Sequence, residues 1–131
     1  MSRGLLDTSV VIARGEGVSQ PLPDEAAISA MTLAELHVGV LLARTDELRG
    51  VRLGILAEIE REFDPLPVDD AVARRFATIV AHERRHGRRP KVADALIAAT
   101  ASAHGLPLYT RDKDFRDTPG VEVTICRPPA G

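Results

Sequence analysis

The sequence predicts an α/β domain in which helices flank a short, mostly parallel β-sheet on both sides. Short apolar runs bounded by turn residues alternate with longer segments of helical periodicity, which is the pattern of such a fold. The chain has 131 residues, the size of a single domain. Its hydrophobic content of 44% is enough to form a core and excludes a wholly disordered chain.

Each element follows from its local pattern. Strands are expected at 4–6, 26–29, 106–109 and 121–125, with a weaker candidate at 65–68. Helices are expected at 8–14, 32–43 and 46–63, between Asp69 and Gly87, and at 92–104. Asp69 is a suitable N-cap, whereas Gly87 and Gly105 favour helix ends. The segment 46–63 has the clearest amphipathic pattern.

Composition limits the class of protein. We expect residues 1–126 to form the domain and residues 127–131 to form a flexible tail. The single Cys126 excludes an intramolecular disulfide and a cysteine-based zinc site. No apolar run approaches the ~20 residues of a membrane helix, and the chain starts without a signal-peptide pattern. A cytoplasmic protein is therefore expected. The net charge of −2 gives no global basic field for nucleic acid.

Four acidic residues stand near the carboxyl ends of the predicted strands. Asp7 ends the first strand and Asp112 follows the strand at 106–109, while Glu35 and Asp94 lie in the first turns of two helices. In a parallel sheet these points converge on one edge. Converging carboxylates repel one another, and a bound cation relieves the repulsion. An all-oxygen set selects Mg²⁺, with Mn²⁺ as the alternative, and suits phosphoryl chemistry with metal-activated water.

Each of these acids also has a purely structural interpretation. Asp7 fits an N-cap, Asp94 complements a helix dipole, and Asp112 fits an Asx turn. The segment 32–35 matches a capping box, in which Glu35 bonds back to the amide of Thr32. Only the joint placement of the four acids favours a metal site.

Four blocks of the sequence, in order, span most of the chain: LLDTSVV at 5–11, SAMTLAELHVG at 29–39, DALIAATA at 94–101 and YTRDKDF at 109–115. Together they resemble a PIN domain and, within that family, the VapC-type toxins of bacterial toxin–antitoxin modules. The resemblance implies a single PIN-like domain and a Mg²⁺-dependent endoribonuclease that leaves 5′-phosphate and 3′-hydroxyl ends. No Ser, Cys or His is placed as an activated nucleophile, so a covalent intermediate is not expected.

The resemblance also assigns residues and partners. The metal and catalytic acids of the family correspond to Asp7, Glu35, Asp94 and Asp112. Many relatives place the fourth acid two residues later, where this chain has Asp114. Thr110 corresponds to a small polar position that supports the site. The family commonly forms homodimers, and its usual partner is a small antitoxin whose tail lies in the groove and places a basic side chain near the acids.

A dense group of cations immediately precedes Asp94. Arg88, Arg89 and Lys91 are expected to hold the RNA backbone, because phosphate contacts supply most sequence-independent affinity. The alternative is a solvated helix end, where Arg favours the helix dipole. With one Tyr, three Phe and no Trp, a platform of aromatic side chains for base stacking is not expected.

Other functions stay open at this point. A receiver-type phosphoacceptor domain would need paired acids after the first strand and a Lys after the fifth. This chain has one acid in the first position and no Lys after its last strand. A PIN nuclease that acts in RNA maturation or on DNA is a further alternative. An inactive interaction module is disfavoured because all four acids are present.

Overall fold

The computed structural model describes residues 1–126 and has a four-stranded parallel sheet. The strands are β1 (Arg3–Leu6), β2 (Glu25–Ile28), β3 (Leu108–Thr110) and β4 (Val123–Ile125), in the order β2-β1-β3-β4. All three strand pairs are parallel, so the predicted α/β fold is confirmed. The tail expected at 127–131 lies outside the described residues.

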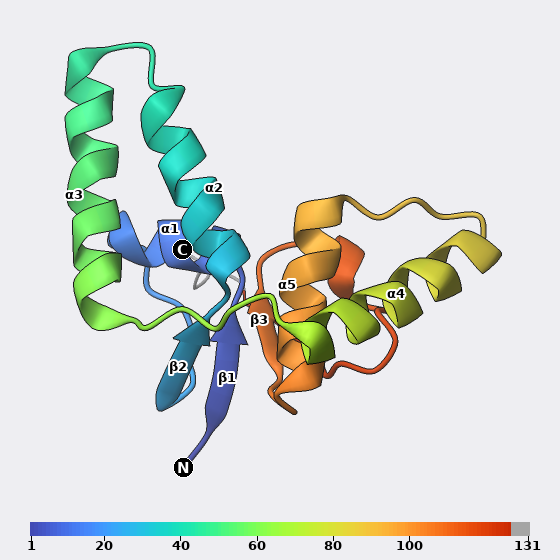
Figure 1. The fold of residues 1–131 in the computed structure, drawn as a ribbon. Coiled ribbons are helices and arrows are strands. Elements are labelled where there is room, and N and C mark those ends of the chain that lie inside the picture. Colours follow the sequence, from blue (N-terminus) through green and yellow to red (C-terminus); the bar gives the residue numbers. More distant parts are fainter. Residues whose placement is uncertain (127–131) are drawn as a thin grey trace.

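Five helices flank the sheet in two layers (Figure 1). They are α1 (Thr8–Gly15), α2 (Ala30–Leu41), α3 (Asp46–Glu62), α4 (Asp70–Arg85) and α5 (Val92–Ala103), and a short 3₁₀ turn, η1 (Lys113–Phe115), follows β3. Consecutive strand residues face opposite sides of a sheet. Leu5 accordingly packs with residues of α4 and α5, while Leu6 packs with residues of α1, α2 and α3.

Several helix boundaries confirm the sequence prediction. The Asp69 carboxylate accepts a hydrogen bond from the Val72 amide at 3.0 Å and caps α4. Gly87 and Gly105 follow α4 and α5 with φ angles of 73° and 62°, which L side chains rarely adopt. A residue with a side chain at either position would strain the turn that ends the helix.

The alternative interpretation of 32–35 as a capping box is wrong. Helix α2 begins at Ala30, and the Ser29 hydroxyl caps it by accepting from the Met31 amide at 2.9 Å. The strand expected at 26–29 includes Ser29, and this placement gives no sign of its capping role. Because Ser29 caps the helix, Glu35 is not needed as a capping residue.

Two further elements differ from expectation. The candidate strand at 65–68 reduces to one bridge, in which Leu66 pairs with Ser29 beyond the end of β2. Helix α3 buries only Leu56 and Ile59, although the whole segment is amphipathic. Helices α2 and α3 form a pair that extends beyond the sheet (Figure 1), so the far part of α3 has no core to cover.

Candidate active site

The register of the sheet brings three segments together at its carboxyl edge. Leu6 of β1 lies opposite Ile28 of β2 and Tyr109 of β3. The next residues of these strands are Asp7, Ser29 and Thr110, which therefore meet at one edge. The Asp7 amide donates to the Tyr109 carbonyl at 2.8 Å, which extends the β1–β3 pairing to the acid itself.

Asp7 is buried and held by two hydroxyl groups. Its Oδ2 atom accepts from the Ser9 hydroxyl and from the Thr110 hydroxyl, each at 2.8 Å. The side chain makes no capping bond to α1, although Asp7 occupies the N-cap position. Its Oδ1 atom has no hydrogen-bond donor among residues 1–126. The N-cap interpretation of the Asp7 side chain is therefore wrong, and one carboxylate oxygen is left for a ligand.

Glu35 is oriented by a hydroxyl that follows Asp7 in the sequence. The Thr8 hydroxyl donates to Glu35 Oε1 at 2.7 Å and shares a second hydrogen bond of 3.0 Å with the buried Thr32 hydroxyl. The sequence prediction gave no role to Thr8 or Ser9. The available signal was two hydroxyl residues directly after a strand-end carboxylate, a position from which they reach neighbouring acids.

Asp94 shows that the acids act on one another. Its pKa is raised from 3.8 to about 6, first by burial and then by the negative charges of Asp7 and Glu35, with a smaller contribution from Asp112. The Lys91 ammonium partly opposes this rise. The other three acids that the sequence singled out thus lie within electrostatic reach of the Asp94 carboxyl group.

Asp112 and Asp114 differ in position. The Asp112 amide donates to the Thr110 hydroxyl at 3.0 Å, and the Asp112 carboxylate accepts from the Asp114 amide at 2.9 Å. The Asx-turn interpretation of Asp112 is therefore confirmed, in addition to its place beside the other acids. Asp114 is exposed and is absent from the charges that shift the pKa of Asp94.

The acidic side chains fit a divalent ion that keeps several bound waters, rather than an ion whose ligands all come from the protein. Within residues 1–126, no three His, Cys, Asp or Glu side chains are gathered tightly enough to hold a metal by themselves. Mg²⁺ binds through one or two carboxylates and keeps several waters, so it needs no such group of side chains. Carboxylates that raise the pKa of a neighbour are the groups whose repulsion a cation relieves.

The predicted RNA-binding cations lie in the loop between α4 and α5 and are exposed. They line a cleft of about 290 Å³ together with Asp94 and Asp114. Arg88 is ion-paired with Glu83 in the last turn of α4. Arg89 and Lys91 make no ion pair within residues 1–126, so their charges are available at the cleft.

Thr110→Val is expected to weaken metal-dependent activity more than it weakens the fold. The substitution removes the donor to Asp7 and the acceptor for the Asp112 amide. We expect cleavage or metal affinity to fall about 10- to 100-fold, with a stability loss of roughly 1–3 kcal/mol. A metal titration of activity and thermal unfolding measure the two effects. Thr100→Val, at another fully buried threonine, is the control. Equal metal dependence in both variants would contradict the role of Thr110.

Comparisons with known proteins identify the family. Residues 5–121 match the PIN domain family. The chain belongs to this family. The Mycobacterium tuberculosis protein named ribonuclease VapC5 is 42% identical to this PIN domain over 128 residues, covering 95% of this chain and 94% of that protein. Ribonuclease VapC4 of the same organism is 39% identical over 126 residues, covering 92% and 95%.

The PIN fold is also shown by a solved structure. The crystal structure of VapBC-5 from Mycobacterium tuberculosis, described as a member of the VapBC family of toxin–antitoxin systems, contains a chain with a TM-score of 0.83 and 40% identity. The match covers 95% of this PIN domain and 99% of that chain. A receiver-type domain does not fit, because it needs a fifth strand and the described sheet has four. None of the described helices has the length and apolar character needed to cross a membrane.

Proposed function

We propose that this PIN domain is a metal-dependent endoribonuclease that acts as the toxin of a toxin–antitoxin pair. The observation that carries the proposal is the convergence of Asp7, Glu35 and Asp112 on Asp94, whose pKa is raised to about 6 first by burial and then by their negative charges. The names of the relatives, ribonucleases VapC5 and VapC4, support RNA as the substrate.

We propose Mg²⁺, with Mn²⁺ as the alternative, held by the same four acids with Asp114 at the margin. The ion would supply Lewis acidity and activate water for attack on phosphorus. The protein's own hydrogen bonds fix the acids: Thr110 and Ser9 hold Asp7, and Thr8 holds Glu35. This arrangement limits the reorganisation of the carboxylates during the reaction.

Cations beside the acids are suited to hold the RNA chain. Lys91 lies close enough to Asp94 to influence its pKa, and Arg89 lines the same cleft. We assign both to phosphates of the bound RNA, where each contributes affinity that weakens with salt. Arg88 belongs to the same loop, but its charge is already paired with Glu83.

A small antitoxin is the proposed partner, in line with the VapBC complex among the similar structures. The pair formed by α2 and α3 carries exposed apolar side chains that the core does not use, at Val38, Leu41, Leu42, Leu48 and Val51. An apolar surface of this kind is typical of a protein interface. A basic antitoxin side chain would complement the four acids, and Arg offers a planar fork for paired carboxylates. A homodimer is the other assembly that would cover these residues.

Expression of the chain alone is expected to arrest growth, and co-expression with its antitoxin is expected to restore it. Tagged protein purified from its native host should carry a small stoichiometric partner, identified by mass spectrometry. Leu41→Glu, at a side chain that is 77% exposed, should weaken this capture without changing RNA cleavage. Asp94→Asn should abolish growth arrest but keep the partner.

Normal growth together with no small partner would contradict the toxin role. A nuclease that acts in RNA maturation, or on DNA, would then be the remaining interpretation of the site. Size-exclusion chromatography of the purified chain with and without Leu41→Glu distinguishes a homodimer through this surface from an antitoxin complex.

A further inference from the structure

The cleft between α4 and α5 contains polar groups that the proposed hydrolysis does not use. Its volume is about 290 Å³, and its floor is formed by four buried apolar side chains: Ile79, Ala95, Ala98 and Phe115. Asp94, one of the four converging acids, lines the same cleft as the ion pair between Arg88 and Glu83. A ligand in the cleft would therefore lie beside the acidic site.

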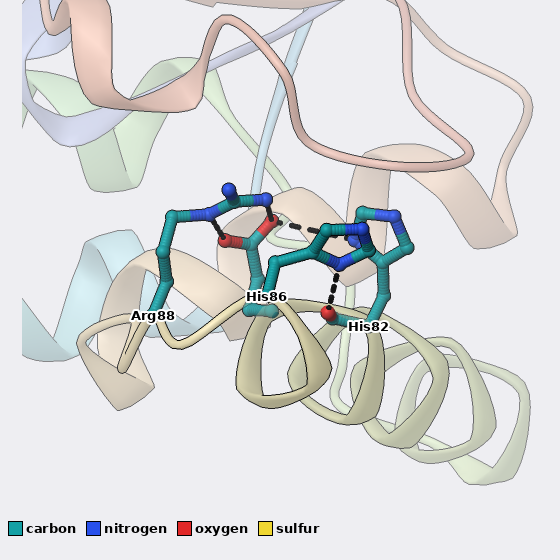
Figure 2. A network of polar contacts seen from close by, with 4 residues as sticks. His82, His86 and Arg88 are labelled. Atoms are coloured by element: carbon teal, nitrogen blue, oxygen red, sulfur yellow. Dashed lines mark hydrogen bonds and ion pairs between the residues drawn. The ribbon is translucent and has the colours of Figure 1, made fainter.

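Glu83 holds the Arg88 guanidinium through one edge (Figure 2). The Nε atom donates to Oε2 of Glu83, and the Nη2 atom donates to Oε1 at 3.3 Å. Glu83 is nearly enclosed, with 12% of its side chain exposed, and His82 lies on its other side at 3.7 Å. The His86 ring lies next to the His82 ring, tilted by 35°, with ring centres 4.4 Å apart. The carboxylate is thus fixed by its surroundings, and it fixes the plane of Arg88.

The other edge of Arg88 remains available. A guanidinium has five N–H donors, and Glu83 takes one from Nε and one from Nη2. Nη1 has no hydrogen-bond partner within residues 1–126. Two parallel N–H groups, one on each terminal nitrogen, are left on a side chain that is 50% exposed. Such a fork recognises a ligand with two adjacent acceptors.

The charge balance favours a neutral ligand at this fork. The Arg88 cation is compensated by Glu83, and Asp117 adds a further negative charge nearby. A phosphate would gain little from a cation that is already neutralised, and it would face the carboxylate as well. Arg89 and Lys91, which make no ion pair within the described residues, are the better phosphate ligands. The apolar floor suits the faces of a flat ring.

We propose that the cleft binds a guanine base of the RNA, with the free edge of Arg88 donating to O6 and N7. Guanine is the one base with two adjacent acceptors on its Hoogsteen edge. Cytosine offers O2 and N3 on its Watson–Crick edge, but its single ring covers less of the apolar floor than a purine does. Adenine presents N7 beside an amino group, which would point its hydrogens at the donors of Arg88. The inference rests on the proposed function and deepens it, because it makes Arg88 and Glu83 specificity residues for a nucleotide next to the cleaved bond.

Nucleotide binding to the full chain in EDTA tests the site without cleavage. The ligands are GMP, IMP, 7-deaza-GMP and AMP, followed through the ¹⁵N signal of Arg88 Nε. GMP and IMP, which share O6 and N7, should bind at least about tenfold more tightly than AMP. 7-Deaza-GMP lacks the N7 acceptor and should bind as weakly as AMP. Equal affinities for all four, or inorganic phosphate binding as well as GMP, would overturn the proposal.

Matched variants separate the effect of the two parallel N–H donors of Arg88 from the effect of its positive charge. Arg88→Lys keeps the charge and loses the two parallel donors, so the preference for GMP should disappear. Glu83→Gln leaves the cation unbalanced, so phosphate affinity should rise while discrimination between bases falls. Arg85→Lys, at an exposed residue outside the cleft, should change neither. Retention of the GMP preference in Arg88→Lys would overturn the assignment of Arg88.

Mapping of cut sites then distinguishes this inference from the proposed function. Wild-type protein should enrich guanine at one position beside the cleaved bond, and Arg88→Lys should remove the enrichment. Cleavage of RNA with no guanine preference would overturn the inference and leave the nuclease standing. Selective GMP binding without cleavage of any RNA would overturn the proposed function and leave the base site standing.

Discussion

Asp94→Asn is expected to lower RNA cleavage at least about 100-fold and to stabilise the protein at neutral pH. The loss of activity follows from removing one charge from the proposed metal site, where each contact to the ion would be worth several kcal/mol in the transition state. The side chain keeps its shape, so the fold is retained. Initial rates on a defined RNA, measured at saturating metal, give the first effect.

The stabilisation expected from Asp94→Asn increases as the pH rises. The pKa of Asp94 is about 6 in the folded protein and near 3.8 when unfolded. Between these values the folded state binds more protons, so this group makes stability fall as pH rises. Asn has no such dependence. Above pH 6 the variant should be more stable by roughly 1–2 kcal/mol, allowing for solvent screening, and the difference should vanish below about pH 4.

A matched acid tests the structural alternative for Asp94. Asp70 also lies in the first turn of a helix, at the start of α4, but it is absent from the charges that shift the pKa of Asp94. Asp70→Asn should cost a few tenths of a kcal/mol through the helix dipole at any pH where it is ionised and should leave cleavage unchanged. Near-normal cleavage by Asp94→Asn, with a stability loss like that of Asp70→Asn, would show that Asp94 serves only the helix.

Asp7→Asn is expected to abolish activity to a similar extent and to change the titration of Asp94. The amide oxygen can keep the hydrogen bonds from Ser9 and Thr110, while the negative charge is lost. Asp7 is the first charge that raises the pKa of Asp94 after the effect of burial. The pKa of Asp94 should therefore fall below 6 in this variant.

Carboxyl ¹³C chemical shifts of Asp94, followed against pH in EDTA, measure this coupling directly. Asp24→Asn, at an acid whose carboxylate contacts Ser2 instead, is the control and should leave the titration unchanged. The double variant of Asp7 and Asp94 should lose no more activity than either single variant, because both acids act in one site. If the pKa of Asp94 is the same in the wild-type protein and in Asp7→Asn, the two carboxylates do not share a site.

The convergence of the acids could be predicted because it depends on the local sequence pattern and on the parallel direction of the strands. Asp7 and Asp112 follow apolar strands, and parallel strands bring their carboxyl ends to one edge. Asp69, Gly87 and Gly105 were predictable for a similar reason, since capping depends on a few neighbouring residues. These features need no knowledge of distant contacts.

The connections between the acids could not be predicted from local pattern. Thr110 reaches Asp7 across 103 positions of sequence, and Thr8 reaches Glu35 across 27. A threonine gives no periodic signal that reveals such a partner. The segment 32–35 fits the capping-box motif, which is the structural alternative for Glu35, yet Ser29 caps the helix instead.

The ion pair of Arg88 and Glu83 was missed for a different reason. Glu83 lies in the last turn of α4 and Arg88 beyond its end, five residues later. Helical spacing links residues three or four apart, so it gives no signal for a pair that forms only when Gly87 turns the chain. The exposure of Leu48 and Val51 was likewise hidden, because an amphipathic pattern does not show where the core ends.

Incubation of the purified protein with total RNA, with Mg²⁺ or with EDTA, followed by mapping of the cut ends, tests the central claim most directly. We predict cleavage that needs the divalent ion, yields 5′-phosphate and 3′-hydroxyl ends, and is absent in Asp94→Asn. Full activity in EDTA, or ends that carry a cyclic 2′,3′-phosphate, would contradict the account of four acids acting together on a phosphodiester.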